Sequence, residues 1–151
     1  MKKFKLTSEF IVDISGVKLF RIKALIEFGN VKAGDLGGYI EKEENLSHMG
    51  NAWVSGNARV FGNAWVSGNA WVFGDARVSG DKDYAYAHGF GSCNRTTTFF
   101  RLKDGDVGVR CGCFYGTLAQ FRDNVCETHG ETKKAQEYLM LADLMDFRFK
   151  N

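Results

Sequence analysis

The chain has no proline among its 151 residues, only three histidines, and charges that nearly cancel. Twenty Lys and Arg residues against 18 Asp and Glu residues leave a formal net charge of +2. A charge this small, without a basic run anywhere in the sequence, gives no reason to expect nucleic acid as a partner. Any binding function must therefore rest on local groups of side chains.

Long hydrophobic runs are also missing. The N-terminal segment MKKFKLTSEF carries lysines without an apolar run behind them, so it does not have the pattern of a signal peptide. No stretch of the sequence is long and apolar enough to cross a membrane. These absences predict a cytoplasmic protein in which the four cysteines are reduced.

The most regular feature of the sequence is a set of five near-identical hexapeptides between Gly50 and Asp81, GNAWVS GNARVF GNAWVS GNAWVF GDARVS. In each unit Ala and Val are two residues apart, which places them on one face of an extended strand. Gly and Asn or Asp stand at the bends, because both tolerate a left-handed backbone. Units this short must stack on their neighbours to bury apolar side chains.

Three such units predict one triangular coil, so residues 18 apart lie above one another. This register places Trp53 next to Trp71 and Arg59 next to Arg77. The order of Val, a two-residue corner and Ala resembles that of hexapeptide-repeat proteins with a left-handed parallel β-helix. The resemblance implies a mainly β fold whose core is a short left-handed parallel β-helix of hexapeptide repeats.

The extent of the repeat phase predicts three regions: an N-terminal β cap at 1–39, the β-helix core at 40–91 and a C-terminal α+β appendage at 92–151. Ile40 and Leu46 continue the repeat backwards in the register of Ala52, and His48 does so in the register of Val54. Both open ends of the coil need caps, because unpaired strand edges invite polymerisation.

Both flanks carry hairpin patterns. Alternating apolar residues at 10–14 and 19–25, joined by Ser15-Gly16, predict an N-terminal hairpin. The Gly-rich stretch at 31–39 predicts a loop that leads into the repeat. Strands at 97–102 and 107–113 predict a second hairpin through Asp104-Gly105, in which Leu102 faces Val107.

Two helices are expected after the second hairpin. Thr117 and Gln120 form a capping box, and the first helix ends at His129-Gly130. Thr132 caps a second helix that runs to about residue 147. The predicted inward residues are Leu118, Phe121 and Val125 in the first helix and Ala135, Tyr138, Leu139, Ala142 and Met145 in the second.

The flanking segments FGNVKAGDLGGYIEKEENLSHMGNAWV, TTTFFRLKDGDVGVRCGCFYGTLAQF and THGETKKAQEYL look like uncharacterised β-helix proteins encoded by phages and prophages. This likeness covers nearly the whole chain. It implies a phage origin, and with it the host cytosol as the location. It offers no catalytic residues that could be transferred to this sequence.

The Trp side chains of the repeat point away from the Val face and are predicted to lie outside. So many exposed large aromatic side chains are unusual on a protein surface. We therefore expect them to be buried by another subunit, by the chain's own ends or by a ligand. Together with the Arg positions they suit an aromatic ring carrying phosphate, or an acidic protein partner. The predicted ligand- or partner-binding residues are Trp53, Arg59, Trp65, Trp71 and Arg77.

Other chemistries are open. Hexapeptide acyltransferases use a His as general base, and His88 is the histidine of this chain suited to that role. A polymer-forming structural protein would need open coil ends. Cys111 and Cys113 share an apolar face of the predicted hairpin, so with Cys93 and Cys126 they are expected to be structural thiols. No metal site and no cofactor is predicted.

The resulting hypothesis is a non-enzymatic, phage-type binding protein that forms a homo-oligomer, with a trimer as the favoured form. It would inhibit host defence by seizing a host protein or by sequestering a nucleotide-like signal. A hexapeptide-type acyltransferase and a polymer-forming structural protein are the alternatives.

Overall fold

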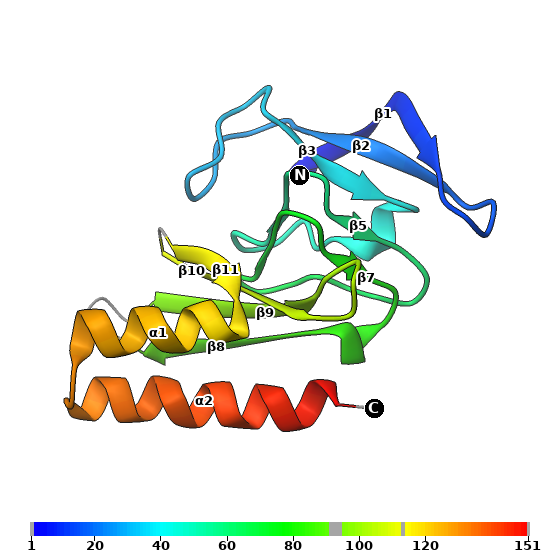
Figure 1. Cartoon of the computed structure of the whole chain (residues 1–151). Helices are drawn as coiled ribbons and strands as arrows, with labels where there is room; N and C mark the ends of the chain where they lie inside the picture. The colour runs from blue at the N-terminus through cyan, green and yellow to red at the C-terminus, as the bar shows by residue number, and fades with distance from the viewer. Residues whose placement is uncertain (1, 91–94, 113, 151) are drawn as a thin grey trace.

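The computed structural model describes residues 2–90, 95–112 and 114–150. These residues form a mixed α/β fold of small sheets and two helices (Figure 1). The strands are β1 (Phe4–Val12), β2 (Lys18–Ala24), β3 (Leu36–Ile40), β4 (Trp53–Val54), β5 (Arg59–Val60), β6 (Trp71–Val72), β7 (Arg77–Val78), β8 (Tyr84–Phe90), β9 (Arg95–Arg101), β10 (Val107–Cys111) and β11 (Phe114–Thr117). The helices are α1 (Leu118–His129) and α2 (Lys133–Phe149), and short 3-10 turns lie at Glu43–Asn45 and Asp81–Asp83.

The elements follow one another in layers. A five-stranded sheet has the order β1-β2-β3-β5-β7, an antiparallel sheet has the order β11-β10-β9-β8, and β4 pairs with β6. Figure 1 shows β1, β2 and β3 at one end of the molecule and α1 and α2 at the other, with the repeat and the four-stranded sheet between them.

The prediction of a parallel β-helix is wrong. The repeat supplies strands of only two residues, and these do not build a closed or solenoid-like sheet. Strands β5 and β7 instead extend the antiparallel strands β1, β2 and β3 into a mixed sheet. The physical reason is the small number of units, because so few hexapeptides cannot sustain long parallel ladders. The longer flanking strands therefore provide most of the strand pairing.

The predicted register within the repeat is nevertheless confirmed. Trp53 pairs with Trp71, and Arg59 with Arg77, each in parallel register. The Val and Ala residues of all five units are buried as predicted.

The predicted phase before the repeat is wrong. Ile40 pairs with Val60 and Leu46 forms a bridge with Val66, so both take a Val position and not the register of Ala. Val54 lies eight positions after Leu46, whereas the repeat has a spacing of six, and a turn accommodates the two extra residues.

His48 consequently lies outside the predicted register. Its ring stacks on Phe4 with the centroids 4.2 Å apart, and its Nδ1 accepts a hydrogen bond from the Lys3 backbone N–H at 3.0 Å. The extra residues thus turn His48 toward the first strand of the N-terminal hairpin.

The N-terminal hairpin is confirmed, since β1 and β2 pair in antiparallel register. The loop predicted at 31–39 instead ends in strand β3. Gly37 makes this possible, because a Cβ at that position would collide with the Val54 carbonyl oxygen and the Trp53 ring. Glycine thus lets β3 come close enough to the repeat to join its sheet.

The second hairpin is confirmed, but its predicted register is wrong by one residue. Val107 pairs with Arg101 and not with Leu102. Leu102 belongs to the turn, where its N–H donates to the Asp106 carbonyl oxygen, and it bridges to Ala76 of the repeat. A tertiary contact therefore sets the length of the loop.

Both helices and their caps are confirmed. The Thr117 hydroxyl accepts from the Gln120 N–H, and the Gln120 side chain accepts from the Thr117 N–H. Gly130 follows the last residue of α1, and α2 extends two residues beyond its predicted end. The predicted inward residues of both helices are buried, with Leu139 only partly so.

Strand β9 separates two hydrophobic cores. Phe100 faces the core that the repeat shares with the N-terminal hairpin. Phe99, on the opposite face of the strand, packs in the core between the four-stranded sheet and the helices. The four-stranded sheet therefore covers the repeat on one side and carries α1 and α2 on the other.

Candidate functional site

A row of cationic and aromatic side chains crosses the five-stranded sheet. The strand register places Arg21 opposite Tyr39, Tyr39 beside Arg59, and Arg59 beside Arg77. Residues that are direct cross-strand neighbours lie on the same face of a sheet. Neighbouring strands are about 4.8 Å apart, so the row extends over roughly 14 Å. We call these four residues the arginine row.

The opposite face of the same strands belongs to the core. Ile40, Val60 and Val78 each follow a member of the arginine row in the sequence, and all three are fully buried. Successive side chains of a strand point to opposite faces, so burial of these aliphatic residues holds the row on the other side. The pattern of the repeat therefore positions Arg59 and Arg77.

The two ends of the arginine row differ in their electrostatic environment. The Arg21 guanidinium donates to a Glu9 carboxylate oxygen at 2.9 Å, to the Gly37 carbonyl oxygen at 2.9 Å and to the Tyr39 hydroxyl. Its central carbon lies 4.5 Å from the centroid of the Tyr39 ring. The charge of Arg21 is thus compensated within the chain.

Arg59 and Arg77 are less well compensated. Arg77 donates to the carbonyl oxygens of Asn57 at 3.3 Å and Ala76 at 2.9 Å, which carry no formal charge. The Arg59 Nε is buried and has no hydrogen-bond partner among the described residues. Burial, and next the charge of Arg59, lower the pKa of Arg77 from its ordinary value.

Two carboxylates act electrostatically on this pair, Asp13 on Arg59 and Asp75 on Arg77, without an ion pair to either. In the described part of the chain, neither Arg59 nor Arg77 forms an ion pair. Asp75 is ion-paired with Lys103, with 3.8 Å between Nζ and Oδ2, and Asp13 accepts three hydrogen bonds within its own turn. Like charges that face each other on adjacent strands are destabilising. An anion bound over Arg59 and Arg77 would relieve the repulsion and accept their hydrogen bonds.

The predicted Trp residues do not join the arginine row. The prediction that Trp53 faces outward is wrong, because its side chain is 3% exposed and packs edge-to-face against Phe28 at 5.3 Å. The chain's own N-terminal segment thus covers this Trp. Trp65 is 53% exposed, beside the bridge of Leu46 with Val66. Trp71 lies in the separate β4–β6 pair.

Trp71 is fixed from several sides. Its indole N–H donates to the Ser55 hydroxyl at 2.6 Å, and its backbone N–H donates to the Thr98 hydroxyl at 3.0 Å. The Arg110 guanidinium stacks 4.0 Å from the Trp71 ring centroid and 4.8 Å from that of Phe73. The cationic partner of Trp71 is therefore Arg110 of the four-stranded sheet, and not an Arg of the repeat.

Sequence reasoning missed Arg21, Tyr39 and Arg110. The first two enter the row through the pairing of β3 with β5, which the assumed phase of Ile40 hid. Arg110 could be assigned to the outer face of its hairpin from the alternation of Val107, Val109 and Cys111, but nothing local shows that this face meets the repeat.

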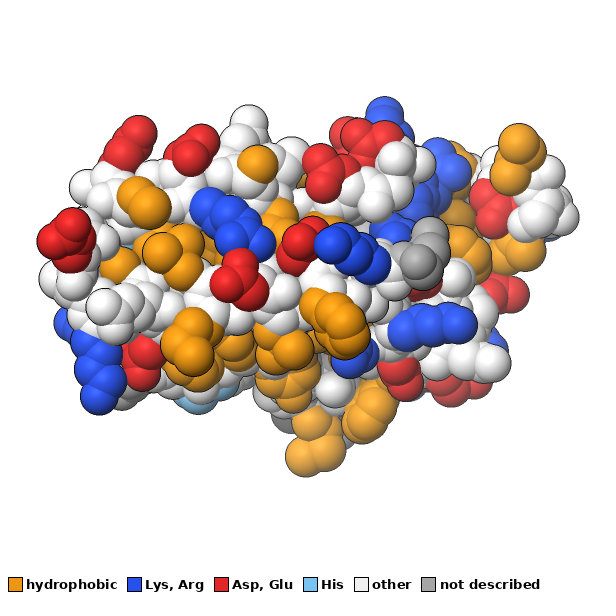
Figure 2. All heavy atoms as spheres, turned by 60° about the horizontal axis from the view of Figure 1, so that its bottom comes forward, with side chains coloured by type: hydrophobic (Ala, Val, Ile, Leu, Met, Phe, Trp, Pro, Cys, Tyr) orange, Lys and Arg blue, Asp and Glu red, His pale blue; other side chains and the backbone are white. Residues whose placement is uncertain are grey.

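A second surface of note is the outer side of α2. Met140 is 71% exposed, Leu144 54% and Phe147 78%, and their spacing places them in one stripe along the helix. Figure 2 shows hydrophobic side chains gathered in a row along this helix, between charged ones. We call these three residues the α2 stripe. Exposed apolar groups of this kind mark contact surfaces.

The candidates for catalysis and metal binding are scattered. His88 lies on β8, and one of its ring nitrogens is 2.7 Å from the Thr96 hydroxyl. Cys111 is a buried free thiol, as expected of a structural cysteine, whereas Cys126 is exposed, so the expectation of a buried thiol is wrong there; Cys93 and Cys113 lie outside the described residues. Over residues 2–90, 95–112 and 114–150, no group of three or more His, Cys, Asp or Glu side chains is placed to hold a metal ion.

Comparison of the sequence with protein-family models finds no match, and comparison with curated proteins finds none either. Neither α1 nor α2 has the length and apolar character that a membrane-spanning helix needs. The site must therefore be interpreted from its own chemistry.

Proposed function

We propose that this chain is a non-enzymatic, phage-type binding protein that acts in the host cytosol and inhibits host defence by binding an acidic surface of a host protein. Arg59 and Arg77 are its central contact residues. The observation that carries the proposal is this pair of arginines on neighbouring strands, neither of which forms an ion pair among the described residues.

The chemistry of the pair favours carboxylates. A guanidinium group presents its N–H donors as a planar fork that matches the two oxygens of a carboxylate. In an extended peptide, successive side chains on the same face are about 6.6 Å apart, and equivalent side chains on neighbouring strands are about 4.8 Å apart. Two acidic side chains of a partner can therefore engage Arg59 and Arg77 together, with Tyr39 beside them.

Self-association is part of the proposal. The chain is expected to form a homo-oligomer, with a trimer as the form favoured at the level of sequence. The α2 stripe supports an interface of this kind, since Met140, Leu144 and Phe147 expose more than half of their side chains. It lies on a helix at the end of the molecule opposite β1, β2 and β3, so contacts there would leave the arginine row accessible.

The test is binding of a fluorescent oligoglutamate peptide, followed by anisotropy in the full-length wild type and in two variants, Arg59→Met and Arg77→Met. Loss of one charge-assisted contact is expected to weaken binding by about tenfold to a hundredfold. Affinity in the wild type should also fall with added salt, because exposed charges are screened.

Arg122→Met is the matched control. Arg122 is a surface arginine that pairs with Asp143 at 2.6 Å, far along the chain from the row. Equally weak peptide binding in all three variants would mean that binding depends only on net charge, which would contradict the proposed site. Native mass spectrometry of the wild type gives a second check. Extra mass of nucleotide size on the oligomer would favour nucleotide sequestration over a protein target.

A further inference from the structure

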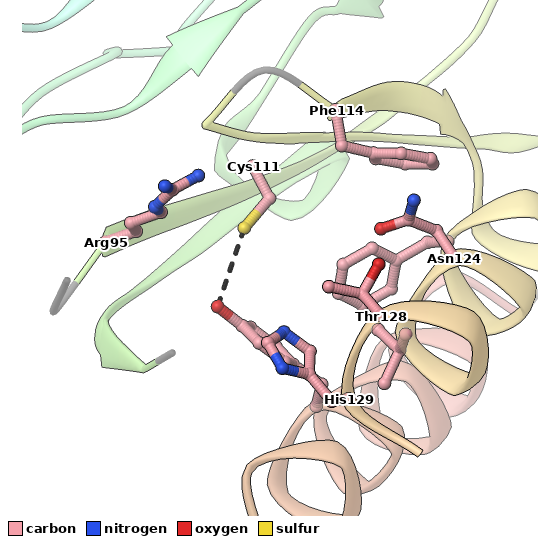
Figure 3. A pocket seen from close by; sticks show the side chains of 9 residues that line it. Arg95, Cys111, Phe114, Asn124, Thr128 and His129 are labelled. Atoms are coloured by element: carbon pink, nitrogen blue, oxygen red, sulfur yellow. Dashed lines mark hydrogen bonds between the residues drawn. The ribbon is translucent and has the colours of Figure 1, made fainter. Parts of the chain in front are cut away.

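A cavity lies between the four-stranded sheet and the helices, beside the core that joins them, and contains no member of the arginine row. Its volume is about 420 Å³, within the range of about 300–1,000 Å³ that small-molecule sites occupy. Figure 3 shows Arg95 and Cys111 on the sheet side, and Asn124, Thr128 and His129 on the helix side. Residues from both layers therefore converge on one space.

The floor of the cavity is polar although it is buried. The Thr97 hydroxyl donates to Cys111 Sγ at 3.2 Å, and the Tyr138 hydroxyl lies 3.7 Å from the same sulfur. Tyr138 is 3% exposed, and its burial raises the pKa of its phenol above the ordinary value. The phenol thus keeps its proton. A thiol is only a weak acceptor, so an anionic oxygen would be a better partner for this O–H.

One wall of the cavity is aromatic. The Phe114 and Phe121 rings lie 5.7 Å apart, and Phe121 meets Tyr138 edge-to-face at 5.5 Å. Val125 adds an aliphatic side chain to this wall. Such a surface favours a planar ring, because aromatic rings prefer offset and edge-to-face contacts with one another.

The charged group of the cavity is cationic. Arg95 lines it and points toward Cys111 in Figure 3, and its charge acts on Tyr138. His129, whose ring lies 5.7 Å from that of Tyr138, adds another donor or acceptor at the helix end.

We propose that this cavity binds a small aromatic anion, with its carboxylate or phosphate between Arg95 and the Tyr138 hydroxyl and its ring against Phe114 and Phe121. The site is independent of the proposed function at Arg59 and Arg77. It gives the chain a small-molecule ligand in addition to a protein partner.

The experiment is a ligand-observed NMR titration of the full-length protein with benzoate, phenyl phosphate and neutral benzamide at millimolar concentrations. At least one of the two anions is expected to bind more than about tenfold tighter than benzamide, because a charge-assisted contact is worth that much. The stronger of the two anions identifies carboxylate or phosphate as the natural group. Equal binding of benzamide, or no binding of any probe, would overturn the proposal.

Substitutions of the residues that line the cavity test where the anion binds. Arg95→Met should weaken anion binding by about tenfold or more, and Tyr138→Phe by a few-fold, because Phe keeps the ring packing but removes the donor. Arg95→Lys, which keeps the charge and loses the fork, is the second variant should the Met variant unfold, and it too should bind more weakly. Arg122→Met, which removes a surface charge that belongs neither to the cavity nor to the arginine row, should bind the anion like the wild type. Unchanged affinity in folded Arg95→Met and Arg95→Lys would refute the site, whereas a loss confined to Arg77→Met would transfer the anion to the arginine row.

Discussion

Lys3 provides a quantitative test of the packing between the N-terminal strand and the repeat. Its side chain is buried, and the ammonium Nζ donates to the Ala52 carbonyl oxygen at 2.7 Å and to that of Gly50 at 3.4 Å. It also lies 4.6 Å from the centroid of the Phe28 ring. Burial lowers the pKa of Lys3 from 10.5 to about 8. The perturbation is Lys3→Met, which keeps the length of the side chain and removes the charge.

The sign of the pH dependence follows from the direction of the shift. Because the pKa of Lys3 is lower in the folded state, the unfolded chain binds this proton more tightly. Stability therefore rises with pH between about 8 and 10.5, where the unfolded state holds more protons. From about pH 7.5 to about pH 9.5 the linkage amounts to about 2 kcal/mol, an upper bound because penetrating water screens the charge.

The assay is urea unfolding at these two pH values under reducing conditions, for the wild type, Lys3→Met and Lys2→Met. Lys2 is an exposed neighbour that pairs with Glu43 at 3.0 Å, so its variant controls for the loss of a positive charge. The wild type and Lys2→Met should gain more stability on going to the higher pH than Lys3→Met does. The same change of unfolding free energy with pH in all three proteins would refute the burial of a desolvated ammonium group at this position.

Two further predictions concern the repeat. Trp53→Ala should lower the free energy of unfolding by about 3–5 kcal/mol, because it opens a cavity against Phe28; a loss below about 1 kcal/mol in urea unfolding would contradict that burial. Gly74→Ala should lower the melting temperature more than Gly16→Ala does, because both residues have positive φ but only at position 74 would the Cβ collide with the Tyr115 hydroxyl. Equal melting temperatures for the two Gly variants would show that Tyr115 moves aside freely.

Local features of this protein follow from its sequence. The six-residue spacing of Val sets the pairing of Trp53 with Trp71 and of Arg59 with Arg77, because stacked units can align in few ways. The capping box at Thr117 is equally local, since its donors and acceptors lie within one helical turn. The positions of both hairpins and the buried faces of both helices were predictable for the same reason, whereas the register of the second hairpin was not.

The fold and the site depend on contacts that the repeat pattern does not contain. The β-helix prediction failed because the strands of the repeat are only two residues long and one of them, β5, pairs with β3 of the N-terminal flank, and the resemblance gave no information about that pairing. The α2 stripe and the cavity at Tyr138 likewise arise where elements far apart in the chain meet or remain uncovered.

The sequence by itself determined that Arg59 and Arg77 lie side by side, because the period of the repeat allows no other register. Only the tertiary structure decided that Tyr39 and Arg21 complete their row, that Trp53 is buried and that Arg110 stacks on Trp71. Periodicity fixes neighbours within a repeating stack, whereas the pairing of β3 with β5 and the packing of the four-stranded sheet join residues whose separation follows no period.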